Sequence, residues 1–356
     1  MVSRIREVEA VPRNHERADG ERVLFIPLPC YIGPERYLLN LREIKKTIRS
    51  TSSVEASFIA RVPSPIGTLL LGELGKRQHP YGLEVVGDPR DAFTRDAVRH
   101  PFRQFFRWWF SRNLVNQCAK ADAAAYVTEY ALQERYPCPA FSTSVSSIDL
   151  PREAFIGSPR RYPRSTGVFT LVFVGSLAQQ YKAPHILIDA VGACVAGGLN
   201  LQLLMVGDGK HRSELEVRAK ALGLVDKVIF LGQLKAGAQV RDQLDKADLF
   251  ILPSYTEGLP RAMLEAMARS LPCIGTIVGG IPELLPEEDM VPPGDVPALA
   301  EKIREVLSDP ERLSRMAERN FEKARQYSNR FPQAKRLAFY QYVRDVTEVW
   351  LSQKGS

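Results

Sequence analysis

The sequence predicts an α/β protein whose parallel sheet is covered by helices on both faces. Between residues 169 and 280, short and continuously apolar stretches alternate with amphipathic ones, which is typical of buried parallel strands joined by helices. The length of 356 residues indicates two domains, at about 100–200 residues each. A composition of 45% hydrophobic and 25% charged residues is ordinary for a globular protein and excludes collagen-like, coiled-coil and disordered chains.

The expected elements of the first half are irregular in length and spacing. Residues 1–20 are polar and charged and lack the apolar segment of a signal peptide, so we expect a disordered tail there. Residues 155–167 are rich in Pro, Gly, Ser and Arg and are expected to form a linker. Between them, the expected strands cover residues 22–29, 53–62, 81–89, 123–128 and 140–146, and the expected helices cover residues 35–49 and 93–118.

The second half repeats a strand and a helix in regular order. The expected strands cover residues 169–176, 201–209, 227–234, 248–254 and 272–280, and the expected helices cover residues 183–198, 211–223, 240–247, 260–270, 296–307, 310–327 and 332–353. In a parallel sheet of this kind, ligands bind beyond the carboxyl ends of the strands. Several of these ends carry glycine, which allows the backbone to approach a ligand closely.

The segment 254–265 combines an anion site with two carboxylates. Pro260 stands where a helix is expected to begin, and the free N–H groups of a first helical turn attract a diphosphate. Gly258 has no side chain to block it, and Glu257 and Glu265 lie about two turns apart, where they can accept hydrogen bonds from sugar hydroxyls. From spacing alone, a capped helix with two surface glutamates explains the segment equally well.

Four motifs that follow one another along the chain favour a ligand-binding site over a capped helix with surface glutamates. The stretch T-E-G-L-P-R-A-M-L-E-A-M-A (256–268), followed by L-P-C-I-G-T-I-V-G-G-I-P-E-L-L (271–285), resembles the E-x7-E signature of glycosyltransferase family 4, the retaining nucleotide-sugar transferases of GT-B fold. Upstream, V-F-V-G-S-L-A-Q-Q-Y-K (172–182), L-M-V-G-D-G (204–209) and V-I-F-L-G (228–232) resemble the phosphate loop and two strand ends of that family. The resemblance covers residues 168–325.

The resemblance implies a role for each matching residue. Glu257 would face the donor sugar hydroxyls, and Glu265 would hold the ribose of the nucleotide. Gly258 and Leu259 would offer backbone amides to the distal phosphate. Lys182 would neutralise charge on the leaving diphosphate, although a solvated lysine at a helix start is the alternative. No metal and no cofactor are implied, because Lys182 and the helix end neutralise the diphosphate.

Further strand ends complete the implied donor site, with some departures from the family. Gly175, Ser176, Gly207 and Gly232 are expected to line it. The usual Gly-Arg of the phosphate loop reads Gly175-Ser176, so one expected cation is absent, and Lys182 stands one residue further from the glycine than in the commonest form.

The N-terminal half departs more from the family pattern. Its loop at residues 27–34 carries only Gly33, where the family often has several glycines. Asp88 stands where the family often has a histidine, and it either takes over substrate contact or is a turn aspartate before Pro89. We therefore place Asp88 with Glu257 and Lys182 as the candidate catalytic residues. At about 150 residues the half is also short, so a strand or two can be missing.

The resemblance implies two Rossmann-like domains facing across a cleft. Residues 21–160 would bind the acceptor, residues 161–331 the nucleotide sugar, and the helix over 332–356 would cross back to the first domain. The implied activity is that of a retaining hexosyltransferase-type glycosyltransferase that moves a sugar from a UDP- or GDP-sugar to a glycan or lipid-linked acceptor in polysaccharide or glycoconjugate biosynthesis. The alternatives are a GT-B nucleotide-sugar epimerase and a degenerate transferase that only binds nucleotide sugar.

Charge adds an expectation about the acceptor. The net charge is +7, and residues 1–165 carry 25 Lys and Arg against 18 Asp and Glu, whereas the rest of the chain carries 23 of each. Residues 99–112 interleave arginines with aromatic residues, as in a helix at an anionic membrane surface, although a helix packed on the domain core gives the same pattern. The acceptor would then be a polyprenyl-diphosphate-linked glycan; no nucleic-acid fold accompanies the charge.

Cysteine usage and hydropathy indicate where the protein acts. The five cysteines are scattered and form no CxxC pair, which favours a reducing compartment over a disulfide framework or a zinc site. No apolar run approaches the length of a membrane span. We expect a cytoplasmic protein that is peripheral at the inner face of the plasma membrane.

Overall fold

The C-terminal half forms a six-stranded sheet in which every pair of neighbouring strands is parallel. The computed structural model describes residues 1–4, 21, 23–31, 33–93, 101–146, 148–163, 167–328 and 331–354. The strands are β7 (Phe169–Val174), β8 (Leu201–Val206), β9 (Val228–Gly232), β10 (Leu249–Leu252), β11 (Cys273–Thr276) and β12 (Met290–Val291). Their order, β9-β8-β7-β10-β11-β12, is that of a doubly wound sheet, which reverses direction between β7 and β10.

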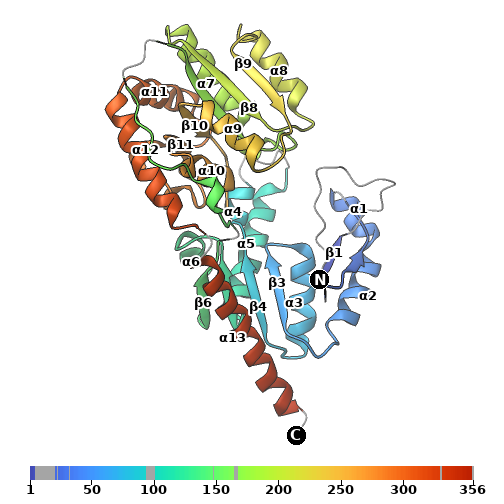
Figure 1. Cartoon of the computed structure of the whole chain (residues 1–356). Coiled ribbons are helices and arrows are strands. Elements are labelled where there is room, and N and C mark those ends of the chain that lie inside the picture. Colours follow the sequence, from blue (N-terminus) through green and yellow to red (C-terminus); the bar gives the residue numbers. More distant parts are fainter. Residues whose placement is uncertain are drawn as a thin grey trace.

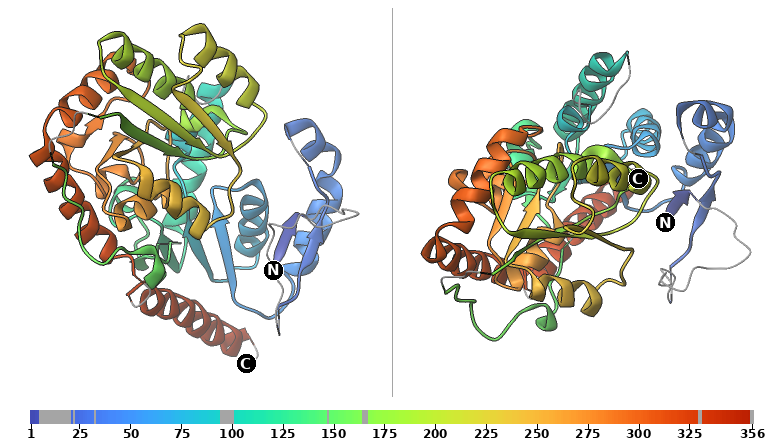
Figure 2. Two further views of the ribbon diagram at one scale, coloured as in Figure 1. Left: turned by 45° about the horizontal axis from the view of Figure 1, so that its top comes forward. Right: turned by 90° about the horizontal axis from the view of Figure 1, so that it is seen from above.

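Helices cover both faces of this sheet, as its apolar strands require (Figure 2). They are α7 (Pro184–Ala196), α8 (Arg212–Ala221), α9 (Ala238–Lys246), α10 (Arg261–Ala268), α11 (Val296–Leu307) and α12 (Pro310–Arg325). Helix α7 packs against α8 and α11, whereas α10 packs against α9 and α12. Asp295 and Asp309 begin α11 and α12 by accepting N–H groups of the first turn at 2.9 Å each. The α/β class predicted from the sequence is confirmed.

The N-terminal half is built on a smaller parallel sheet of four strands in chain order. They are β3 (Phe58–Val62), β4 (Tyr81–Val85), β5 (Ala123–Tyr126) and β6 (Phe141–Ser144), connected by α3 (Pro65–Lys76), α4 (Pro89–Ala92), α5 (Arg103–Ala119) and α6 (Ala131–Arg135). A separate two-stranded sheet, β1 (Val2–Arg4) with β2 (Ile26–Leu28), lies to one side with α1 (Gly33–Leu39) and α2 (Leu41–Thr51) (Figure 1). Within the described residues, this half is therefore not doubly wound.

The structure corrects two expectations for the start of the chain in part. The expected tail includes β1, which pairs in parallel with β2 and is held by the Arg4 guanidinium, a donor to the Tyr31 carbonyl at 3.2 Å. The rest of that tail, residues 5–20, lies outside the described residues, as do residues 94–100 of the expected helix 93–118. The strand expected at 22–29 is shorter and is not buried throughout, because β2 pairs with β1 and not with the four-stranded sheet.

The chain crosses between the halves twice. The described part of the expected linker is bound to the C-terminal half, because the Arg160 side chain donates to the carbonyls of Leu244 and Ala247. After α12, the last helix α13 (Phe331–Lys354) returns to the N-terminal sheet and packs on β4, β5 and β6 (Figure 1). Phe339 and Val343 fill the space that Gly82 leaves, where a Cβ would come within 2.6 Å of Val343. None of the helices within the described residues combines the length and apolarity needed to cross a membrane.

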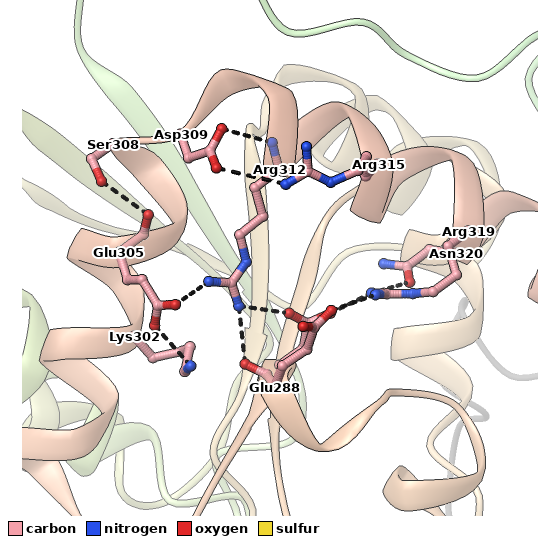
Figure 3. A network of polar contacts seen from close by, with 10 residues as sticks. Glu288, Lys302, Glu305, Ser308, Asp309, Arg312, Arg315, Arg319 and Asn320 are labelled. Carbon is pink, nitrogen blue, oxygen red and sulfur yellow. Dashed lines mark hydrogen bonds and ion pairs between the residues drawn. The ribbon is translucent and has the colours of Figure 1, made fainter.

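A network of ion pairs locks α11 and α12 onto the end of the larger sheet (Figure 3). Arg312 lies at its centre, paired with Glu305 and donating to the Glu288 carbonyl at 3.0 Å. The fully buried Asp289 carboxylate pairs with Arg312 at 3.1 Å and also with Arg319. Two guanidinium groups thus compensate one buried negative charge.

We expect Asp289→Ala to lower the free energy of unfolding by about 3–5 kcal/mol, since it leaves both arginines without their buried partner. Urea denaturation measures the loss. Glu311→Ala is the matched control, because Glu311 is 91% exposed and its substitution is expected to change stability by less than about 0.5 kcal/mol. A loss at Asp289 as small as that of the control would contradict the prediction.

Candidate functional site

The candidate site lies where the larger sheet reverses direction, at the carboxyl ends of β7 and β10. The loops that follow these two strands are joined by a hydrogen bond from the Tyr255 amide to the Tyr181 carbonyl, at 2.7 Å. This bond brings Lys182 beside Glu257, although the two are 75 residues apart in the sequence. The position is the one at which open α/β sheets bind ligands.

Lys182 and Glu257 form a nearly buried ion pair. Lys182 Nζ lies 2.6 Å from Glu257 Oε1, and the two side chains are 14% and 6% exposed. The Ser254 hydroxyl donates to the same carboxylate oxygen at 2.6 Å. The structure thus brings together two residues that the sequence predicted for the site and adds Ser254, which the sequence reasoning missed.

Glycines allow three strand ends to pack backbone against backbone. Gly207 has a φ of +133°, and a Cβ there would lie 1.9 Å from the Gly175 carbonyl oxygen. The Gly207 amide in turn donates to the Gly232 carbonyl at 2.9 Å. Ser176 is exposed beside them, and its hydroxyl accepts the Ala178 amide at 3.2 Å. The four predicted loop residues therefore surround one point at the sheet edge.

The loop before α10 offers free amide donors. Helix α10 begins at Arg261, with Pro260 as its N-cap residue, one position later than the sequence suggested. Neither the Gly258 nor the Leu259 N–H is bonded to an acceptor among the described residues. The Gly258 carbonyl, in contrast, is held by the Gly280 amide at 2.7 Å. These amides and the helix terminus behind them are suited to an anion.

Glu265 lies on α10 with its carboxylate unpaired. No residue in the described part of the chain forms a hydrogen bond or ion pair with that carboxylate. Burial raises the pKa of the Glu265 carboxyl, and the charges of Arg261 and Arg241 partly oppose this effect. A half-buried acceptor without a partner is suited to bind hydroxyl donors of a ligand.

The Asp88 carboxylate forms hydrogen bonds and an ion pair with residues of its own N-terminal half. It is the N-cap of α4 and accepts the Arg90 amide at 2.7 Å. The Tyr136 hydroxyl and the Arg135 guanidinium each donate to its carboxylate at 2.5 Å, and the side chain is 1% exposed. The sequence left two interpretations of Asp88 open, and this geometry favours the one in which Asp88 is a turn aspartate.

Asp91 lies beside Gly279 of the C-terminal half and was not singled out by the sequence. Its Oδ2 is buried without a hydrogen-bond partner among the described residues. Burial and the charge of Asp88 raise the pKa of Asp91, whereas Arg135 and the Gly279 amide lower it. The N-terminal half therefore does present a carboxyl group to the glycine loop at 279, three residues beyond the predicted aspartate.

Known proteins resemble this chain in both sequence and fold. Residues 168–309 match the family described as glycosyl transferases group 1. The protein CapJ of Staphylococcus aureus is 26% identical over 297 residues, which are 82% of this chain and 73% of CapJ. Sucrose-phosphate synthase of Thermosynechococcus elongatus superposes with a TM-score of 0.64 and 20% identity, covering 93% of this chain and 83% of that enzyme. HepE of Anabaena, solved in complex with UDP, superposes with a TM-score of 0.60 and 17% identity, covering 92% and 86% of the two chains.

We expect Lys182→Met to lower the free energy of unfolding by about 3 kcal/mol or more, because it leaves the Glu257 carboxylate buried without a counter-ion. Urea denaturation of Lys182→Met, Glu257→Gln and the double variant measures the coupling. Lys76→Met is the control, since the exposed pair Lys76–Glu73 has nearly the same length, 2.7 Å, and contributes less than about 1 kcal/mol. If the loss of unfolding free energy in the double variant equals the sum of the losses in the two single variants, Lys182 and Glu257 are not coupled.

Proposed function

Because this chain belongs to the group 1 glycosyltransferases and has their GT-B fold, we propose that it transfers a sugar from a UDP- or GDP-sugar with retention of anomeric configuration. We propose that this transfer serves polysaccharide or glycoconjugate biosynthesis, since the relatives include a putative colanic acid biosynthesis glycosyltransferase of Escherichia coli. The proposed acceptor is a glycan, carried on a polyprenyl diphosphate. HepE, a structural neighbour, has been solved with UDP and with UDP-glucose, which supports a nucleotide-sugar donor here.

The observation that carries the proposal is the set of unused binding groups at the switch between β7 and β10. Two backbone amides that have no acceptor among the described residues, at Gly258 and Leu259, lie at the positions assigned to the distal phosphate. The unpaired Glu265 carboxylate lies two turns further along, at the position assigned to the ribose. Each of these groups has the chemistry that the corresponding part of a nucleotide sugar requires.

The Lys182–Glu257 pair suggests how the donor is activated. A bound diphosphate would draw the Lys182 ammonium away from Glu257, and the released carboxylate would then accept hydroxyl groups of the donor sugar. During transfer, the bond between the anomeric carbon and the phosphate oxygen breaks, and the acceptor oxygen bonds to the same face of that carbon. The acceptor hydroxyl proton passes to the leaving diphosphate, whose growing charge Lys182 and the loop amides stabilise without a metal ion.

Helix α5 supports a membrane-bound acceptor. Phe105 and Trp108 are 54% and 57% exposed, and Phe102 before the helix is 65% exposed. The buried face of α5 consists instead of Ser111, Leu114 and Cys118, so these aromatic residues do not serve the domain core. The helix projects from the body of the chain (Figure 2). Exposed Arg107 and Arg112 beside the rings fit an anionic lipid surface, and we propose a cytoplasmic enzyme that docks on the inner face of the plasma membrane.

We expect Glu265→Ala and Lys182→Ala each to lower turnover at least about tenfold, because each removes a group that binds donor or leaving diphosphate. A thermal-shift screen of UDP, GDP and their sugars first identifies the donor, since a bound ligand raises the melting temperature by mass action. Release of the nucleoside diphosphate then gives the turnover. Glu301→Ala, an exposed glutamate on α11, is the control for Glu265.

Full turnover in both variants would overturn the assignment of the site. Conversion of the donor to an epimer without acceptor would indicate the epimerase, and binding without turnover over a broad acceptor panel would indicate a degenerate transferase.

We expect the protein to sediment with anionic but not with neutral liposomes, and added salt to weaken this binding. Phe105→Ser and Trp108→Ser should each weaken it roughly tenfold, because burying one large aromatic side chain contributes about 1.5–3 kcal/mol. Leu337→Ser, on the distant helix α13, is the control because Leu337 is 58% exposed. Equal failure to bind either lipid, at any salt concentration, would favour an acceptor in solution.

A further inference from the structure

A buried carboxylate of the C-terminal half reaches across to the N-terminal half. Glu283 ends the short 3-10 helix Ile281–Glu283, and its side chain is almost fully buried. It accepts the backbone N–H groups of Glu129 at 2.6 Å, Tyr130 at 3.1 Å and Ala131 at 2.9 Å. These donors surround the start of α6, where amide groups have no partner within the helix.

On its own side, Glu283 is attached to the donor loop. The two glycines before the 3-10 helix pack against the backbone of residues 257 and 258. A Cβ on Gly279, which has a φ of +53°, would lie 1.8 Å from the Glu257 carbonyl oxygen, and the Gly280 amide donates to the Gly258 carbonyl at 2.7 Å. A displacement of Glu283 relative to the N-terminal half therefore moves the donor loop with it.

On the other side, Glu283 is linked through helix α6 to two carboxyl groups of the N-terminal half. Helix α6 carries Arg135, which pairs with Asp88 at 2.5 Å and with Asp91 at 3.6 Å. Tyr130 adds a second bond across the boundary, from its hydroxyl to the Pro282 carbonyl at 3.1 Å. Glu283 thus accepts three of the bonds that join the two sides of the proposed active site, and the Tyr130 hydroxyl donates a further one.

The local needs of α6 do not explain this arrangement. Thr128 already caps the helix from within its own half, because its hydroxyl accepts the Leu132 amide at 3.1 Å. If the two halves separated, water could bond to the amides at 129–131, so neither half would lose its own core. What Glu283 adds is three charge-assisted bonds that exist only in the observed orientation of the halves.

We propose that Glu283 is a positioning residue that holds the two halves in the orientation needed for sugar transfer, an inference that rests on the proposed function. Within this arrangement the backbone at Gly258 meets the end of β4 directly, since a Cβ on Gly258 would lie 2.9 Å from the Val86 carbonyl oxygen. Loss of the Glu283 bonds lets these surfaces part. Nucleotide binding, which uses groups of the C-terminal half alone, is retained.

The test compares Glu283→Ala, Glu283→Gln and Glu283→Asp with the wild-type chain. Glu287→Gln is the matched control, because Glu287 is exposed and lies four residues further along the chain. Calorimetry with UDP and GDP gives the nucleotide affinity, and small-angle scattering gives the radius of gyration. Nucleotide release from the donor identified by thermal shift gives the turnover at saturation.

We expect nucleotide affinity to stay within about twofold, whereas the radius of gyration rises and turnover falls at least about tenfold in the alanine and aspartate variants, because misplacement of reacting groups by about 1 Å is costly. The glutamine variant keeps one acceptor oxygen, so its radius of gyration and its turnover should lie between those of these two variants and those of the wild type. An unchanged radius and turnover would overturn the proposal, and so would an equal loss of nucleotide affinity, which would mean that Glu283 only shapes the donor loop. If the wild-type chain turns over no donor, the proposed function fails, and the radius of gyration still decides the role of Glu283.

Discussion

The close approach of three backbone segments around residues 257 and 258 is the constraint on which the rest of the structure depends. The donor loop lies between the end of β4 and the turn at residues 279–280, and glycines stand at each contact. A side chain at any of these positions would push the segments apart. This packing brings the end of the N-terminal sheet against the switch point of the larger one, so the geometry of the candidate site and the contact between the halves are one feature.

Charges are distributed around this contact according to their roles. The buried carboxylates of Asp88, Glu257 and Asp289 each have a positive partner, as buried ionised groups require. Glu265 has none among the described residues, although burial raises its pKa. These three carboxylates thus have their partners within the protein, whereas the Glu265 carboxylate is left for the proposed ligand to bind.

The sequence predicted five of the six strands of the larger sheet, because each is a largely apolar run and several end in glycine, but it missed the two-residue strand β12. It also placed Lys182 and Glu257 in one site, which their ion pair confirms, whereas its placement of Glu265 there stays a prediction. It could not separate the two interpretations of Asp88, whose partners Arg135 and Tyr136 lie 47 and 48 residues away. The role of Glu283 was also hidden, since its partners are backbone amides, which have no signature in the residue types.

The return of α13 to the N-terminal sheet has a consequence for biosynthesis. Phe339 and Val343 complete a small cluster with Ala123 and Ala125 on one face of that sheet. This face stays uncovered until the last helix has left the ribosome, although its strands are made first. The half that is synthesised first is therefore completed last, and the chain exposes an apolar sheet surface throughout the translation of the C-terminal half.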